Sequence, residues 1–134
     1  MKKTVVFCGS FKYFQQMEKA AKMLRKSGIK VIVPQPSHIR HGHKPSELKT
    51  KYDKKTLSKW EGEGAFEHLV NIVQSDIVYI FNQNSYVGPA VTVEIGYALA
   101  LKKPIYALSP VKDITVSNFI NKVLKPSDLL KKLN

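Results

Sequence analysis

The stretch "SDIVYIFNQNSYVGPAVTVEIGYALALKKPIYAL", residues 75–108, carries the pattern that predicts the fold. A β-branched and aromatic run, Asp76–Phe81, precedes a polar turn and then residues 90–101, which have helical character, with Pro89 suited to the first turn. A second apolar run, Pro104–Ser109, comes next. A strand, a helix and another strand in this order predict a right-handed crossover between parallel strands.

The same alternation extends through the rest of the chain. "TVVFCG" (Thr4–Gly9) and "KVIVP" (Lys30–Pro34) predict two buried strands, and "KVL" (122–124) predicts a short fifth strand. "VSNFI" (116–120) suggests a helical turn, and Ser127 is the expected N-cap of a terminal helix. The helix after the first strand is indicated by apolar residues at helical spacing and a glycine stop: Phe14, Met17, Ala21, Leu24 and Gly28. The predicted fold is α/β, a doubly wound sheet of about five parallel strands with helices on both faces.

Residues 35–58 are polar and rich in lysine and histidine. We expect a long loop here, because loops of this length in compact domains usually act as lids or are disordered. Ser58 and Glu61 have the spacing of a capping box, which places the start of the next helix near this point. That helix carries an apolar stripe of Phe66, Leu69, Val70 and Val73.

A chain of 134 residues with 43% hydrophobic side chains is the size of one domain, so we expect residues 1–134 to form a single unit. "MKKTVVFCGSF" reaches glycine before an apolar segment of signal-peptide length has formed. The uncharged stretch 77–101, apart from Glu94, is interrupted by "NQNSYVGP" and therefore does not predict a membrane span. These features predict a soluble, cytoplasmic protein with no membrane partner.

The chain is strongly basic, with 22 lysines and arginines against 10 acidic residues and a net charge of +12. The excess is concentrated in residues 1–67, which hold 15 basic and 6 acidic side chains. Such a balance favours anionic partners, namely nucleotides, nucleic acid or phosphorylated metabolites. A lysine-rich, solvated surface without a specific partner explains the charge equally well.

Cys8 is the only cysteine, so the chain has no internal disulfide and no cysteine pair with metal-ligand spacing. A small residue packed in a strand is the simpler interpretation of Cys8, and a nucleophile is the alternative. His38, His41 and His43 lie in a basic segment with few carboxylates, and we expect no metal there. Asp76, at the opposite end of its strand from the expected site, is predicted to cap or close a turn.

Ligands of parallel α/β sheets bind beyond the carboxyl ends of the strands, which here are followed by "CGSF", "PQPSH", "NQNSYVG" and "SPVKD". The first of these opens a helix, so the backbone N–H groups of Gly9, Ser10 and Phe11 and the Ser10 hydroxyl could hold a phosphate. A plain tight turn is an equally good interpretation of this segment alone.

Glu94 is the only charged residue between Ile77 and Leu101. On a helix it shares a stripe with Val91 and Ala98, so its carboxylate must face a polar cleft or a partner. Gly96 weakens the helix and predicts the close approach of another backbone or a ligand. The alternative is a surface glutamate at a subunit contact.

Together, "VFCGSF" and "SDIVYIFNQNSYVGPAVTVEIGYALALKKPIYAL" resemble the nucleoside 2-deoxyribosyltransferase family. The similarity is greatest to the branch that hydrolyses the N-glycosidic bond of 2'-deoxynucleoside 5'-monophosphates. Its specific part is the pattern of Glu94, Gly96 and Ala98 after a strand and loop, combined with "CGS".

The resemblance implies a flavodoxin-like sheet, a homodimer or higher homo-oligomer, no cofactor, and Glu94 as nucleophile. It assigns phosphate binding to the turn Gly9, Ser10 and Phe11, and it places Gly88 in the loop that approaches the sugar phosphate. Ser117 and Asn118 correspond to a stretch lent by the neighbouring subunit. Asn82, at the end of the third predicted strand, is a further candidate for substrate binding.

Two positions depart from the family pattern. The first strand has Val5 and Val6 where relatives place a tyrosine that hydrogen-bonds the glutamate, and Tyr13, Tyr86 or Tyr97 are the candidates to replace it. His68 stands where relatives carry an acidic residue.

The predicted function is cleavage or transfer at the N-glycosidic bond of a nucleoside or its 5'-monophosphate. A non-catalytic nucleotide-binding module is the alternative if the departures abolish catalysis. Nucleic-acid binding through the basic amino-terminal half ranks last, because no recognised nucleic-acid motif accompanies the charge.

Overall fold

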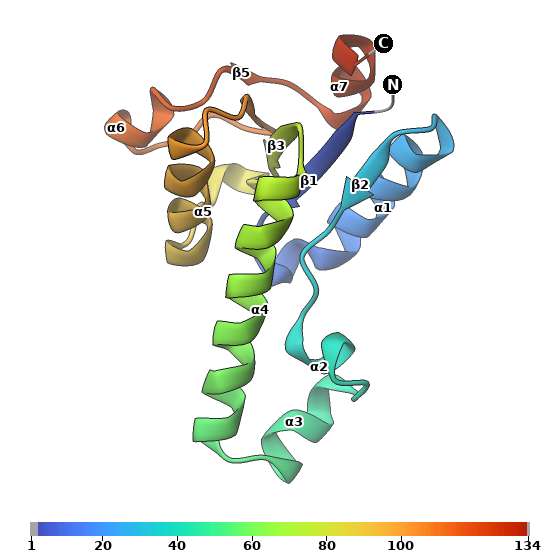
Figure 1. Ribbon diagram of the computed structural model, residues 1–134, viewed down its shortest axis with the longest axis vertical. Coiled ribbons are helices and arrows are strands. Elements are labelled where there is room, and N and C mark those ends of the chain that lie inside the picture. The colour runs from blue at the N-terminus through green and yellow to red at the C-terminus, as the bar shows by residue number, and fades with distance from the viewer. Residues whose placement is uncertain (1–2, 134) are drawn as a thin grey trace.

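The computed structural model describes residues 3–133, which contain one parallel sheet in the order β2-β1-β3-β4-β5 (Figure 1). The strands are β1 (Thr4–Cys8), β2 (Lys30–Ile32), β3 (Ile77–Ile80), β4 (Ile105–Ala107) and β5 (Lys122–Val123). Every neighbouring pair is parallel. This order is that of flavodoxin-like sheets, so the predicted fold class is confirmed.

Helices cover both faces of the sheet. The helices α1 (Phe14–Lys26) and α7 (Pro126–Leu133) lie on one face, and α4 (Lys54–Gln74) and α5 (Pro89–Ala100) pack together on the other. The remaining helical segments are short: η1 (Phe11–Tyr13), α2 (Ser37–Arg40), α3 (Pro45–Lys51), η2 (Gln83–Ser85) and α6 (Ile114–Ser117). No helix among residues 3–133 has the length and hydropathy needed to cross a membrane.

Side-chain alternation along β1 divides the core into two layers. Val5 and Phe7 point toward the α1 side, whereas Val6 and Cys8 point toward α4 and α5, and all four are fully buried. Successive residues of a strand face opposite sides, so a strand covered on both faces is apolar throughout. Cys8 therefore ends β1 directly beneath α5, which carries Glu94.

The prediction of a long loop at 35–58 is wrong. Helices α2, α3 and the start of α4 occupy most of that segment. The Glu47 carboxylate accepts the Lys44 N–H at 2.8 Å at the start of α3, and the rings of His41 and Trp60 stack with centroids 3.8 Å apart. These local contacts stabilise the helical structure of this segment, which its polar composition does not predict.

The predicted start of α4 is also wrong. Asp53 caps the helix by accepting the Thr56 N–H at 2.8 Å, so Ser58 and Glu61 lie inside the helix and form no capping box. The helix buries His68 and Ile72. Most of the apolar stripe faces outward, with Phe66, Val70 and Val73 exposed and Leu69 partly buried.

The sequence predicts a capping or turn role for Asp76, before β3, and for Ser127, at the start of α7. Asp76 accepts the Thr4 N–H at 2.8 Å and so joins the amino ends of β3 and β1, which confirms its predicted structural role. Ser127 is not an N-cap, because α7 already begins at Pro126. Proline suits a first helical position because its missing N–H would have no partner there.

Candidate active site

Three of the four predicted segments meet at a cavity of about 260 Å³ at the carboxyl edge of the sheet. Its volume is just under the range of about 300–1,000 Å³ typical of small-molecule sites, so it suits one small ligand. The lining residues are Gly9, Ser10, Phe11, Pro34, Gln35, Ser37, Glu61, Gly64, Ala65, His68, Tyr86, Gly88, Pro89, Ala90, Val91 and Glu94. The fourth segment, "SPVKD", borders a separate hollow with the loop that carries Tyr86.

The turn after β1 forms one end of the cavity. Ser10 precedes η1, and its hydroxyl accepts the Lys12 N–H at 3.4 Å. A Cβ atom at Gly9 would lie 2.9 Å from the Phe81 carbonyl oxygen and 3.0 Å from Met17 Sδ, so only glycine fits here without displacing the backbone just after β3. The glycine thus lets the backbone of the turn lie directly against the end of β3.

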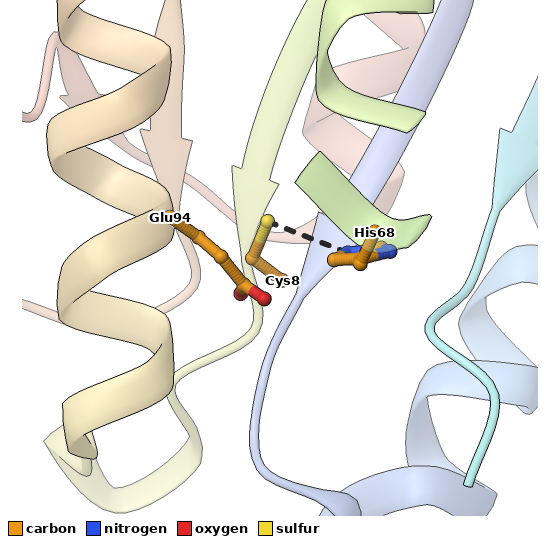
Figure 2. Close-up of side chains that lie close together, drawn as sticks. All are labelled: Cys8, His68 and Glu94. Carbon is orange, nitrogen blue, oxygen red and sulfur yellow. Dashed lines mark hydrogen bonds between the residues drawn. The ribbon is translucent and has the colours of Figure 1, made fainter. Parts of the chain in front are cut away.

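Glu94 lies on α5 and points toward the sheet rather than away from it (Figure 2). Only 9% of the residue is exposed, and it lines the cavity. Burial raises the pKa of its carboxyl group to about 7, because the charged form loses hydration, while a hydrogen bond with Cys8 acts in the opposite direction. The site therefore holds a carboxyl group that titrates near neutral pH.

The Cys8 thiol is the nearest polar partner of Glu94 on β1 (Figure 2). Burial, together with the neighbouring carboxylate, raises the pKa of the thiol well above its ordinary value, so Cys8 stays protonated and acts as a donor. Of the three tyrosines suggested as replacements, Tyr86 lines the cavity, whereas Tyr13 and Tyr97 do not. Sequence reasoning missed this role of Cys8.

His68 comes from α4 and completes a compact trio with Cys8 and Glu94 (Figure 2). Its Nε2 lies 2.8 Å from the Phe7 carbonyl oxygen and 3.7 Å from Cys8 Sγ, and Nδ1 lies 3.2 Å from the Asn71 amide nitrogen. A carbonyl only accepts, so Nε2 carries the hydrogen and Nδ1 accepts. Burial lowers the pKa of His68, which keeps the ring neutral.

The donor atoms of Cys8, His68 and Glu94 lie within 4.8 Å of one another. A thiolate, an imidazole and a carboxylate together form a donor set that zinc accepts. Here the Nε2 hydrogen is already donated to Phe7, and the raised pKa of the thiol favours its protonated form. A metal would have to displace both hydrogens, so the contacts favour a hydrogen-bonded trio.

Lys12 contacts Tyr86, one of the residues that line the cavity. The Lys12 ammonium is 3.8 Å from the centroid of the Tyr86 ring, a cation–π contact. A Cβ atom at Gly88 would lie 3.1 Å from the Tyr86 hydroxyl, so glycine leaves room for this ring. Lys12 is thus positioned beside the turn at Ser10 without lining the cavity.

The remaining predicted site residues lie elsewhere. Asn82 is fully buried and uses its amide on the backbone of Ser109, donating at 2.8 Å and accepting at 2.9 Å. Ser117 and Asn118 both donate to the Ile114 carbonyl in α6 and do not line the cavity of their own chain. The prediction for Gly96 is wrong within the chain, since a Cβ atom there meets nothing within 4 Å.

Sequence reasoning also missed the far wall of the cavity. Ser37 and Glu61 lie there, and the Ser37 hydroxyl donates to Glu61 Oε1 at 2.7 Å. The signal for Ser37 was present in "PQPSH", which follows β2 at the carboxyl edge. For Glu61, the spacing from Ser58 predicts a capping box and conceals its place in the cavity.

Comparison with known proteins gives a family and a fold. A model of the family described as nucleoside 2-deoxyribosyltransferase matches residues 5–123. A comparison with curated proteins finds no significant match.

Two solved structures resemble the chain at low sequence identity. A 2-deoxyribosyltransferase from the psychrotolerant bacterium Bacillus psychrosaccharolyticus aligns with a TM-score of 0.61 and 19% identity, over 95% of this chain and 90% of its own. A conserved protein from Enterococcus faecalis aligns with a TM-score of 0.63 and 14% identity, over 99% and 98% of the two chains. Both likenesses concern the fold.

Proposed function

Because the chain belongs to the nucleoside 2-deoxyribosyltransferase family, we propose that it cleaves or transfers the N-glycosidic bond of a deoxynucleoside 5'-monophosphate, with Glu94 as nucleophile. The observation that carries this proposal is the buried Glu94 carboxyl group, which shares one small cavity with the turn at Ser10. A phosphate bound at the turn and a sugar bound against the carboxylate would occupy the part of the cavity lined by Ser10 and Glu94.

In the proposed reaction, a Glu94 carboxylate oxygen attacks the anomeric carbon, and the glycosidic electron pair leaves with the base nitrogen, which takes a proton from solvent. Water then attacks the same carbon and loses a proton. The bond between this carbon and the Glu94 oxygen breaks, which restores the carboxylate and releases deoxyribose phosphate. If a second base attacks instead, the result is transfer. The Cys8 thiol holds the carboxylate in place, the neutral His68 lies against that thiol, and neither acts as a nucleophile.

The turn at Gly9, Ser10 and Phe11 supports a monophosphate substrate. Backbone N–H groups at the start of a helical segment bind phosphate oxygens, and the Ser10 hydroxyl adds a further donor. Lys12, held over the Tyr86 ring, supplies a positive charge two residues after Ser10. The net charge of +12 would raise the local concentration of an anionic substrate.

The test is a screen for freed bases. Purified protein should release free base from at least one deoxynucleoside 5'-monophosphate, detected by liquid chromatography, and the matching nucleoside without phosphate should react more slowly. A parallel reaction with a second free base distinguishes transfer from hydrolysis.

Two results would contradict the proposal. A monophosphate that raises the melting temperature but is never consumed would indicate a non-catalytic binding module. Tight duplex binding with a steep salt dependence, without any effect of mononucleotides, would indicate a nucleic-acid-binding protein.

The outer face of α4 and α5 supports a homo-oligomer. It exposes apolar side chains on two adjacent helices: Phe66, Val70, Val73, Val93 and Tyr97. Phe66 is 73% exposed and Val93 is 61% exposed, and a concentration of exposed apolar side chains on two packed helices is typical of an interface. We assign this face to a second copy of the chain, and the family resemblance implies that Ser117 and Asn118 serve the neighbour's site.

Val93→Asp should therefore give monomers. A buried charge without a partner is costly at an interface, whereas the same aspartate is tolerated by a free surface. Light scattering after gel filtration would measure the mass, with Gln16→Asp on the exposed side of α1 as a control of equal charge. A wild-type protein that is monomeric and active at all concentrations would overturn this assignment.

A further inference from the structure

The cavity contains a second carboxylate, Glu61, whose position the proposed chemistry leaves unexplained. Glu61 lies on α4 seven residues before His68, so the two share one face of the helix and are separated by about 10 Å along its axis. His68 contacts Cys8 beside Glu94. Glu61 and Glu94 therefore line one cavity, with His68 and Cys8 on the Glu94 side and Glu61 further along α4.

Hydrogen bonding fixes one half of the Glu61 carboxylate. Ser37 is 5% exposed, and its hydroxyl donates to Oε1 at 2.7 Å, which leaves Oε2 free to accept from a ligand. Arg40, the nearest cation along α2, is used elsewhere: it donates to the Trp60 carbonyl at 3.1 Å and pairs with Glu67 at 3.0 Å. In the described part of the chain, Glu61 has no cationic partner.

The cavity wall differs in charge from the protein as a whole. Its described lining includes Glu61 and Glu94 but no lysine or arginine, although the chain carries a net charge of +12. A wall of this kind attracts N–H donors and repels carbonyl oxygens. Gly64 and Ala65, between Glu61 and His68 on the same helix, add no large side chain of their own to the lining, although the Arg40 guanidinium packs against Gly64.

We infer that Glu61 reads the base, accepting a hydrogen bond from an exocyclic amino group, and that the site prefers amino-bearing bases to their oxo counterparts. This inference rests on the proposed function, since it takes the sugar to lie at Glu94. Cytosine and adenine offer an amino group where uracil and hypoxanthine offer a carbonyl oxygen. The carboxylate gains a charge-assisted hydrogen bond with the first pair and meets a lone pair in the second.

The experiment measures binding and uses Glu94→Gln protein, so that turnover does not consume the ligand. Calorimetry would compare dCMP with dUMP, and dAMP with dIMP. We expect the amino member of at least one pair to bind about tenfold more tightly, because a hydrogen bond to a charged group outweighs one to a neutral group.

Adding Glu61→Gln should reduce that ratio to about one, since an amide accepts from an amino group and donates to an oxo group equally well. Glu63→Gln, on the same helix but outside the cavity lining, is the matched control and should leave the ratio unchanged. Both substitutions are at exposed positions, so the fold should be retained.

The outcomes separate the two proposals. Equal binding of both members of each pair, or a preference that survives Glu61→Gln, overturns the role of Glu61 and leaves the proposed function standing. If neither wild-type protein nor the Glu94→Gln variant binds any of the four nucleotides, the proposed function fails, and base reading by Glu61 fails with it.

Discussion

Glu94→Gln should lower the rate of base release by about three orders of magnitude or more, since losing a covalent nucleophile typically costs that much. Glutamine has nearly the same shape and still accepts a hydrogen bond from Cys8, but its amide oxygen does not form the covalent sugar intermediate. The measurement is the single-turnover rate of base release from the best monophosphate. Equal rates for the two proteins would remove Glu94 from the mechanism.

The same variant should be more stable than wild type, which separates loss of chemistry from loss of fold. The folded state raises the pKa of Glu94 from 4.5 to about 7 and so favours the protonated carboxyl. Ionisation of this group therefore costs stability fully above pH 7 and not at all well below pH 4.5. Glu94→Gln should gain up to about 3 kcal/mol in unfolding free energy at pH 8 and almost nothing near pH 4.

The sheet was predictable because its strands are covered on both faces. Burial on two sides makes β1 and β3 continuous apolar runs, and glycine or polar residues mark their ends. Glu94 was predictable for the related reason that a single charge in an apolar helix must have a polar environment. In both cases the residues that predict the structure are close together in the sequence.

The partners of Glu94 depend on long-range packing, which periodicity does not describe. Cys8 meets the carboxylate only because β1 places it on the α5 side and because α5 crosses that strand end at the position of Glu94. His68 arrives from a helix some sixty residues further along the chain. The place of Glu61 depends on packing in the same way. Its spacing from Ser58 predicts a capping box, but Asp53 caps α4 five residues before Ser58.

Helix α4 also illustrates how two stripes can compete in one helix. The more apolar stripe, with Phe66 and Val70, faces outward, and the stripe with His68 and Ile72 faces the sheet. Hydrophobicity alone favours burying the first stripe, and within one chain that expectation is wrong. A second copy of the chain would reconcile the two by burying the first stripe in an interface.

The rate of base release should depend strongly on pH. In the proposed mechanism only the ionised carboxylate attacks, so kcat/KM should fall about tenfold for each unit of pH below the pKa of Glu94, which is about 7. A hydrogen bond from Cys8 lowers that pKa, so its removal in Cys8→Ala should move the acid limb to higher pH. Cys8→Ser keeps a donor and should leave the limb in place or move it to lower pH.

Val6→Ala distinguishes this effect from a general loosening of the core. Val6 and Cys8 lie on the same side of β1 and are equally buried, but valine offers no donor to the carboxylate. A loss of packing should lower stability in both alanine variants, whereas only Cys8→Ala should shift the midpoint of the pH profile. If all four proteins share one midpoint, the thiol is a packing residue and another group sets the pKa of Glu94. If the midpoint follows the donor, Cys8 performs in this chain the hydrogen bonding that the family resemblance assigns to a tyrosine of the first strand.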